Sequence, residues 1–247
     1  MCGRFVSSST PDEIAQYFDA SPPAPEAALE PSWNVAPTND VYVVLETGDV
    51  RKVAPLHWGL VPFWAKSPAV GNKMINARAE TIAEKNAFKQ AFKKRRCIIP
   101  ADGFYEWKAI PGQRVKQPYF IHRGDGEPLA FAGLWEEWRP KDAQGESGNE
   151  TLRSTTILTT SANETMAPVH DRMPVILPPD AWDRWLSDDS DTADLAVLAQ
   201  LLVPAPEHLL VMHPVARDVG NVRNKGPHLI EPVSPAATTD AGTTQRG

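Results

Sequence analysis

The fold class is decided by residues 96–134, which read RCIIPADGFYEWKAIPGQRVKQPYFIHRGDGEPLAFAGL. Short β-branched or apolar runs at 96–100, 119–122 and 129–134 are separated by Gly, Pro and Asp, and another follows at 155–160. Strands that succeed one another without intervening helices favour an antiparallel sheet over a doubly wound parallel one. The sequence therefore predicts an α+β domain with a mainly antiparallel, barrel-like sheet and flanking helices.

Outside this stretch, the patterns predict shorter elements. Thr10 can cap a helix over 10–18, because Pro11 suits the first helical position. We expect the two arms of a hairpin at 41–45 and 50–55 and a strand at 209–212. We expect a basic amphipathic helix at 81–96 and further helices at 179–186 and 191–202. A surface loop is expected at 139–150. Residues 1–232 are expected to form one domain, and 233–247, rich in Thr, Ala and Pro, a disordered tail.

Composition excludes several classes of protein. The 247 residues contain no run of some 18 apolar residues and begin without an apolar signal segment, so we expect a cytoplasmic protein with no membrane contact. Two cysteines cannot build a disulfide framework or a multi-cysteine zinc site, and the histidines lack ligand spacing. We therefore predict no metal and no cofactor. The sequence gives no sign of an obligate partner, and we expect a monomer.

Charge is unevenly distributed along the chain. The formal net charge is -6, yet residues 51–123 contain 15 Lys or Arg and 4 Asp or Glu, a local net charge of +11. Such segregation is typical of a surface that meets a polyanion, although a solvated basic helix would give the same count.

Cys2 is the most informative single residue. Removal of Met1 would leave an α-amine and a thiol on adjacent carbons, with ordinary pKa values of about 8 and 8.5. The amine can condense with an aldehyde to an imine, and the thiol can then close a thiazolidine ring. The same residue could instead attack an amide, with its own amine as base, or be incidental.

Two further clusters could carry chemistry. Asn76 and Arg78 alternate in a short extended segment, so they can share one face; Asn76 could orient a reacting group and Arg78 could hold a phosphate. A structural turn is the alternative. Glu106 follows a buried strand and a turn, where a carboxylate is a candidate general acid, whereas Cys97 lies inside the apolar run and is expected in the core.

The last candidates lie on a loop and among the aromatic residues. His170 is a candidate acid or base and Arg172 a candidate anion contact, although a lone histidine is more often structural. Phe63, Trp64 and Trp107 lie near basic residues and could stack on unpaired bases, with packing as the alternative for each.

Six ordered motifs together resemble the SRAP family, the SOS-response-associated peptidases that include the vertebrate hydroxymethylcytosine-binding embryonic stem cell protein. The resemblance runs from residue 1 to about 232. The motifs are Met-Cys-Gly-Arg-Phe at 1–5, Trp-Asn-Val-Ala-Pro at 33–37, His-Trp-Gly-Leu-Val-Pro at 57–62, Asn-Ala-Arg-Ala-Glu-Thr at 76–81, Ala-Asp-Gly-Phe-Tyr-Glu-Trp at 101–107 and His-Asp-Arg-Met-Pro at 170–174.

The resemblance implies a sensor of abasic sites in single-stranded DNA. It implies that Cys2 becomes N-terminal by self-cleavage and forms a thiazolidine crosslink with the abasic aldehyde, which shields the lesion. It also implies that Asn76 holds the N-terminus, that Glu106 shuttles protons in Schiff-base chemistry, and that His170 assists opening of the sugar ring.

DNA contacts are implied in the same way. Phosphates would be held by Arg4, Arg78 and Arg172; flanking bases would meet Trp64 and Trp107; and the pocket would be lined by Asn34 and Pro37. The expected partner is single-stranded DNA containing abasic sites, with association to the nucleoid when bound. Two alternatives remain open: an N-terminal-cysteine amidohydrolase, and a non-covalent reader of modified bases.

Overall fold

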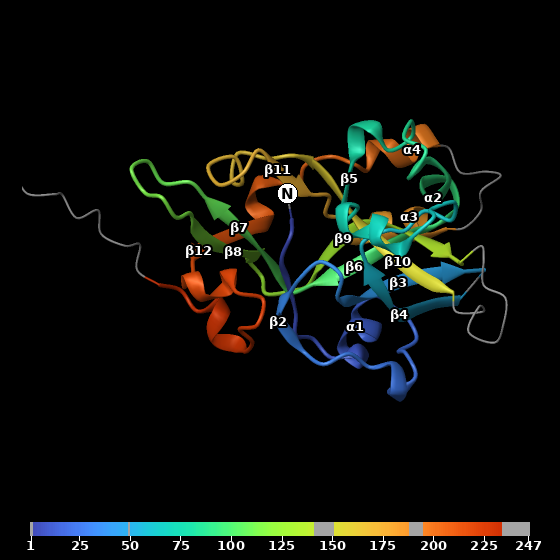
Figure 1. Cartoon of the computed structure of the whole chain (residues 1–247), viewed down its shortest axis with the longest axis horizontal. Helices are drawn as coiled ribbons and strands as arrows, with labels where there is room; N and C mark the ends of the chain where they lie inside the picture. Colours follow the sequence, from blue (N-terminus) through green and yellow to red (C-terminus); the bar gives the residue numbers. More distant parts are fainter. Residues whose placement is uncertain (1, 49, 141–150, 188–194, 234–247) are drawn as a thin grey trace, which may run out of the picture.

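Two β-sheets joined by short helices make up the computed structural model, which describes residues 2–48, 50–140, 151–187 and 195–233 (Figure 1). The strands are β1 (Phe5–Ser7), β2 (Ser32–Val35), β3 (Asp40–Thr47), β4 (Val50–Trp58), β5 (Asn76–Arg78), β6 (Arg96–Ala101), β7 (Gly103–Lys108), β8 (Gln117–Arg123), β9 (Leu129–Trp138), β10 (Leu152–Ser161), β11 (Arg172–Pro174) and β12 (Leu210–Pro214). The α-helices are α1 (Pro11–Tyr17), α2 (Lys89–Lys94), α3 (Trp182–Leu186) and α4 (Leu195–Gln200). The 3-10 helices are η1 (Pro25–Ala27), η2 (Pro68–Lys73), η3 (Ala79–Thr81), η5 (Pro179–Ala181), η6 (Glu207–Leu209), η7 (Arg217–Gly220) and η8 (Pro227–Ile230).

The larger sheet closes on itself. Its order is β11-β10-β4-β3-β6-β9, and β9 also pairs with β10, so five of the strands form a ring. The pairs are antiparallel except where β10 runs parallel to β4 and to β5. The predicted α+β class with a mainly antiparallel, barrel-like sheet is therefore confirmed.

Alternation along the strands of the ring separates two hydrophobic clusters. Val41, Val43 and Leu45 of β3 join a cluster around Phe5, while Tyr42 and Val44 join the cluster that the α-helices cover. Side chains of a strand point alternately to opposite faces. Both faces of β3 are thus buried, which explains its nearly continuous apolar sequence.

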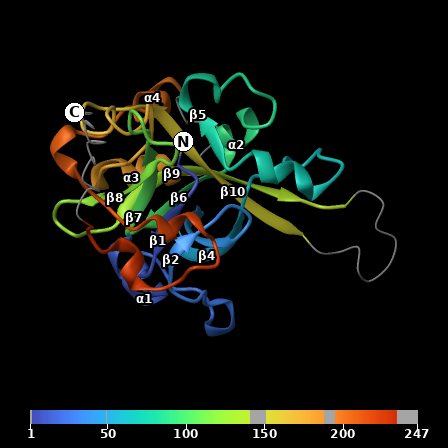
Figure 2. The same cartoon turned by 60° about the vertical axis from the view of Figure 1, so that its left-hand side comes forward.

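The smaller sheet has the order β12-β8-β7-β1-β2 and is antiparallel throughout. Its strand β1 packs against the larger sheet, because the Phe5 ring lies 5.1 Å from Trp58 and 6.3 Å from Phe131 between ring centres. Figures 1 and 2 both show the amino-terminal strand at the centre of the molecule, where the sheets meet. The residues that precede β1 are therefore held between the sheets.

The helix predicted over 81–96 is wrong in length. Only α2, Lys89–Lys94, is α-helical; the pattern itself holds, since Phe88 and Phe92 are buried. The difference lies mainly at the start, because residues 82–88 are not helical; at the other end, the buried Arg96 side chain donates to the Phe92 and Lys93 carbonyls at 2.9 and 2.6 Å and satisfies the last turn.

Several other predicted segments lie partly or wholly outside the residues that the structure describes. Of the helix expected at 191–202, the described part contains α4, Leu195–Gln200. The rest of that segment up to 194, most of the predicted loop (141–150) and the predicted tail after 233 lie outside the described residues. Within the part of the chain that is described, no helix has the length and apolar character needed to span a membrane.

The predicted cap of α1 is present as a reciprocal capping box. The Glu13 N–H donates to Thr10 Oγ1 at 3.2 Å, and the Thr10 N–H donates to the Glu13 carboxylate at 2.8 Å. These bonds hold the pKa of Glu13 below its usual value. We expect Thr10→Ala to lower the free energy of unfolding by about 1 kcal/mol at neutral pH, measured by urea denaturation.

The same measurement in acid supplies a check of the mechanism. A carboxyl whose pKa is depressed in the folded state stabilises the fold at neutral pH, and this contribution is lost as pH falls through that folded pKa. The difference between wild type and Thr10→Ala should therefore shrink in acid, and Thr10→Asn, which can also cap, should stay near wild type. A difference that did not change with pH would contradict the capping-box account.

Candidate functional site

Cys2 lies just before β1 and is held by the neighbouring sheet. Its side chain is fully buried, and its carbonyl oxygen accepts a hydrogen bond from Asn76 Nδ2 at 2.8 Å. Asn76 begins β5, which pairs in parallel with β10 so that Asn76 stands opposite Ile157. The position of the Cys2 backbone is thus set by an amide on a paired strand.

Glu106 supplies the negative charge beside this cysteine. β1 and β7 are antiparallel, and the Tyr105 N–H donates to the Arg4 carbonyl at 2.9 Å, which brings the next residue, Glu106, alongside the start of the chain. Glu106 is 4% exposed. Burial raises the pKa of the Cys2 thiol, and the charge of Glu106 raises it further.

The two cysteines differ in their surroundings. Cys97 is fully buried in β6, where burial raises the pKa of its thiol to about 12. Its Sγ lies 3.4 Å from Thr155 Oγ1. The prediction that Cys97 belongs to the core is confirmed, whereas Cys2 has the carboxylate and the amide beside it.

Arg4 links the site to the segment near the end of the described chain. Its Nη1 donates to Asn34 Oδ1 at 2.7 Å and to the Val219 carbonyl at 2.8 Å, and its guanidinium carbon lies 5.8 Å from the centre of the Trp107 ring. Burial lowers the pKa of Arg4 from its ordinary value. Arg4 and Trp107, which were predicted separately as contacts to a phosphate and to a base, therefore lie side by side.

Asn34 has a different position from the one expected for a residue that lines a pocket. It is fully buried, and its Nδ2 donates to the carbonyls of Val219, Asn221 and Asn224 at 3.4, 3.1 and 3.0 Å. Asn34 thus anchors residues 219–224 and orients Arg4. Pro37 follows β2 and is partly exposed.

A second group of predicted residues gathers at the carboxyl end of β10. Arg78 of β5 stands opposite Thr159, and Arg172 of β11 stands opposite Ser161. Arg172 binds Glu80 through both terminal nitrogens at 2.6 and 2.9 Å, which lowers the pKa of Glu80. Sequence reasoning missed this partner, although Glu80 lies within the same motif as Arg78.

His170 lies on the turn between β10 and β11. Its Nδ1 accepts the Arg172 N–H at 2.9 Å and lies 2.8 Å from Asp171 Oδ1. The first contact needs an unprotonated Nδ1 and the second a protonated one. Which of the two contacts is a hydrogen bond therefore depends on whether Nδ1 carries the hydrogen.

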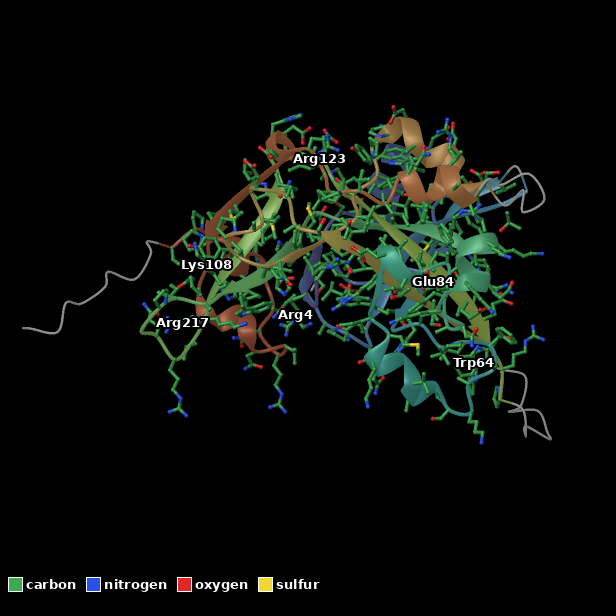
Figure 3. The ribbon with its side chains drawn as sticks, turned by 90° about the horizontal axis from the view of Figure 1, so that it is seen from above. Arg4, Trp64, Glu84, Lys108, Arg123 and Arg217 are labelled. Carbon is green, nitrogen blue, oxygen red and sulfur yellow. The ribbon has the colours of Figure 1, made fainter. Side chains whose placement is uncertain are left out.

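Exposed aromatic side chains lie at some distance from Arg4. Phe63 and Trp64 are 53% and 43% exposed and line an open hollow of about 450 Å³ with Asn86, Lys89 and Gln90. Figure 3 shows Trp64 well to one side of Arg4. In the described residues, no group of three or more His, Cys, Asp or Glu is arranged to hold a metal ion.

A ringed antiparallel sheet with an amino-terminal cysteine region held between an asparagine and a glutamate defines a class of protein. The family model described as SOS response associated peptidase (SRAP) matches residues 1–222. The chain belongs to the SRAP family.

Named relatives agree along almost the whole chain. It is 40% identical over 231 residues to the abasic site processing protein YoqW of Bacillus subtilis, covering 94% of this chain and 99% of that protein. It is 34% identical to the abasic site processing protein YedK of Escherichia coli, covering 94% and 100%, and 31% identical to the abasic site processing protein HMCES of Xenopus tropicalis, covering 92% and 77%.

A crystal structure of a protein from Bacteroides thetaiotaomicron shares the fold. The TM-score is 0.80 at 26% identity, and the match covers 94% of this chain and 100% of that one.

Proposed function

We propose that this protein processes abasic sites in single-stranded DNA by forming a covalent crosslink through Cys2. The observation that carries the proposal is the hydrogen bond from Asn76 to the Cys2 carbonyl, with the Glu106 charge beside the thiol. An amine and a thiol fixed at one position, next to a group able to move protons, suit capture of an aldehyde. Membership of a family whose named relatives process abasic sites supports the same substrate.

The chemistry starts at the peptide bond between Met1 and Cys2. Its hydrolysis consumes one water and releases methionine, leaving the α-amine of Cys2. Among the described residues, no group donates a hydrogen bond to the buried Asn76 Oδ1, so this acceptor is available for the new amine. The amine attacks the aldehyde carbon of the ring-opened sugar, and loss of water gives an imine.

Ring closure completes the crosslink. Cys2 Sγ adds to the imine carbon, the thiol proton passes to nitrogen, and the five-membered thiazolidine results with no further loss of atoms. Burial keeps this thiol protonated at neutral pH, so a base must take its proton as sulfur attacks. We assign to Glu106, whose charge acts on this thiol, the role of that base, and to His170 the opening of the sugar ring.

DNA would reach this site along a basic surface. Arg4, Arg78 and Arg172 would hold phosphates and Trp64 and Trp107 would meet bases, while Asn34 would act through Arg4. Affinity should fall as salt rises, because cations on the protein release counterions from the strand. We propose that a monomer acts in this way, in the cytoplasm and on the nucleoid.

The test is denaturing electrophoresis of the purified protein with an oligonucleotide that carries one abasic site, beside an undamaged strand. We expect a shifted band with the lesion only. Its mass should equal the protein without Met1 plus the oligonucleotide minus one water. No band from a protein with a free N-terminal Cys2 would overturn the proposal. Release of ammonia from glutamine would then support the amidohydrolase, and retention of the strand only under native conditions would support the non-covalent reader.

Asn76 gives a prediction about positioning. Asn76→Ala removes one hydrogen bond from a buried carbonyl, and the loss of such a bond costs about 1–3 kcal/mol. We expect crosslinking to slow about tenfold with unchanged affinity for an undamaged strand, measured by quenched time courses and fluorescence anisotropy. Asn76→Asp also lacks the donor and should be slow, and a wild-type rate for Asn76→Ala would contradict this role.

A further inference from the structure

One end of the basic segment 51–123 lies beside a second basic segment, residues 217–225, that is far from it in the sequence. Residues 108–116, which connect β7 to β8, and residues 217–225 together contain six Lys or Arg and a single acidic residue, Asp218, in a protein of net charge -6. The cations are Lys108, Arg114, Lys116, Arg217, Arg223 and Lys225. All except Lys108 are exposed.

Hydrogen bonds at Arg217 and Val215 join the two segments, whereas Lys225 lines a hollow together with Glu30 and Asp40. Arg217 Nη2 donates to Gln113 Oε1 at 2.9 Å, and the Val215 N–H donates to the Pro118 carbonyl at 3.1 Å. Residues 219–224 are fixed in turn by Asn34 and Arg4. The surface is thus attached directly to Asn34 and to Arg4, two residues after Cys2, although its two halves are about 100 residues apart in the sequence.

Figure 3 shows on which side of Arg4 this surface lies. Arg4 lies between Lys108 and Arg217 on one side and Trp64 on the other. A strand whose abasic sugar reaches Cys2 extends both ways from the lesion. If one flank extends toward Trp64, as the proposed function has it, the opposite direction leads to the side of Lys108 and Arg217.

We propose that residues 108–116 and 217–225 form a binding track for the sugar-phosphate backbone of the DNA flank that leaves the site on this side. The proposal rests on the proposed function for its ligand. Exposed cations with flexible side chains suit the phosphates of a single strand, whose spacing varies with backbone conformation, and the exposed Val115 and Val222, at 53% and 47%, offer apolar contact to sugars or bases. A strand held on both flanks presents its lesion to Cys2 in one register.

The test uses the double variant Arg223→Gln/Lys225→Gln, whose substituted side chains are exposed. Binding of an undamaged single strand is followed by anisotropy against salt, so the readout needs no crosslinking. Each lost phosphate contact lowers the slope of log affinity against log salt by about 0.7. We expect the slope to fall by about 1.4 and the affinity at low salt to fall about tenfold.

A matched control carries the same charge change elsewhere. Lys52→Gln/Arg184→Gln alters β4 and α3, away from β7 and β8 in Figure 1, and should bind like wild type. Equal loss in both double variants would show only a general charge effect, and no loss in Arg223→Gln/Lys225→Gln would also overturn the track. Crosslinking at saturating damaged strand should reach the wild-type end point in both. A wild-type protein that binds through the track yet never crosslinks would refute the proposed function alone.

Discussion

Replacing Cys2 with alanine should abolish the crosslink that survives denaturation. The variant is used once its mass shows that Met1 has been removed; it then keeps an α-amine and can form the imine, but it has no sulfur to close the ring. Imines hydrolyse when the protein unfolds in water. In the thiazolidine, both the nitrogen and the sulfur of Cys2 are bonded to the former aldehyde carbon, so the link survives unfolding. We therefore expect no shifted band from Cys2→Ala on a denaturing gel, against nearly complete conversion of wild type.

Reductive trapping separates the two halves of this chemistry. Borohydride added during the reaction reduces an imine to a stable amine, so the band should return for Cys2→Ala with reductant only. The matched control is Cys97→Ala, which changes the other cysteine within the core and should crosslink like wild type. A full-strength band from Cys2→Ala without reductant would assign the crosslink to another nucleophile. No band even with reductant would mean that the amine does not react.

The features that depend on a few neighbouring residues could be predicted from the sequence, because each lies in a short motif. The strands around residues 96–134 follow from short apolar runs bounded by turn residues. The chemistry available to a cysteine at position 2 can be inferred without knowing the fold. The cap of α1 also depends on neighbouring residues, so Thr10 could be predicted as the cap from Pro11, which follows it. Predictions succeeded where cause and effect lie within a few residues.

Long-range contacts decided what the sequence could not. Asn34 looked like a pocket residue, yet its amide binds carbonyls more than 180 residues further along the chain, which no local pattern indicates. Glu80 engages Arg172 across 92 residues in the same way. The closure of the ring by β9 and β10, and the parallel pairing of β5, bring Asn76 to Cys2. These are properties of tertiary packing, in which polar groups find partners only after the sheets meet.

Glu106→Gln should slow crosslinking about a hundredfold, because positioned acid–base groups contribute about 10²–10⁴ to rate. The substitution keeps the size of the buried side chain and removes both its charge and its capacity to carry a proton. Affinity for an undamaged strand should remain within about twofold, since no phosphate contact is assigned to it. The measurement is the single-turnover rate at saturating damaged strand, with Glu106→Asp as the variant that keeps a carboxyl group.

The sign of the effect distinguishes proton transfer from electrostatics. The negative charge of Glu106 helps to raise the pKa of the Cys2 thiol, so its removal in Glu106→Gln lowers that pKa and makes the thiolate easier to form. If Glu106 acted through its charge alone, the glutamine variant would crosslink at the wild-type rate or faster at neutral pH. A proton carrier predicts the opposite: a slow glutamine variant whose rate rises with pH as hydroxide replaces the missing base, and an aspartate variant of intermediate rate. A fast Glu106→Gln protein would therefore remove Glu106 from the reaction and leave Asn76 as the group that prepares Cys2.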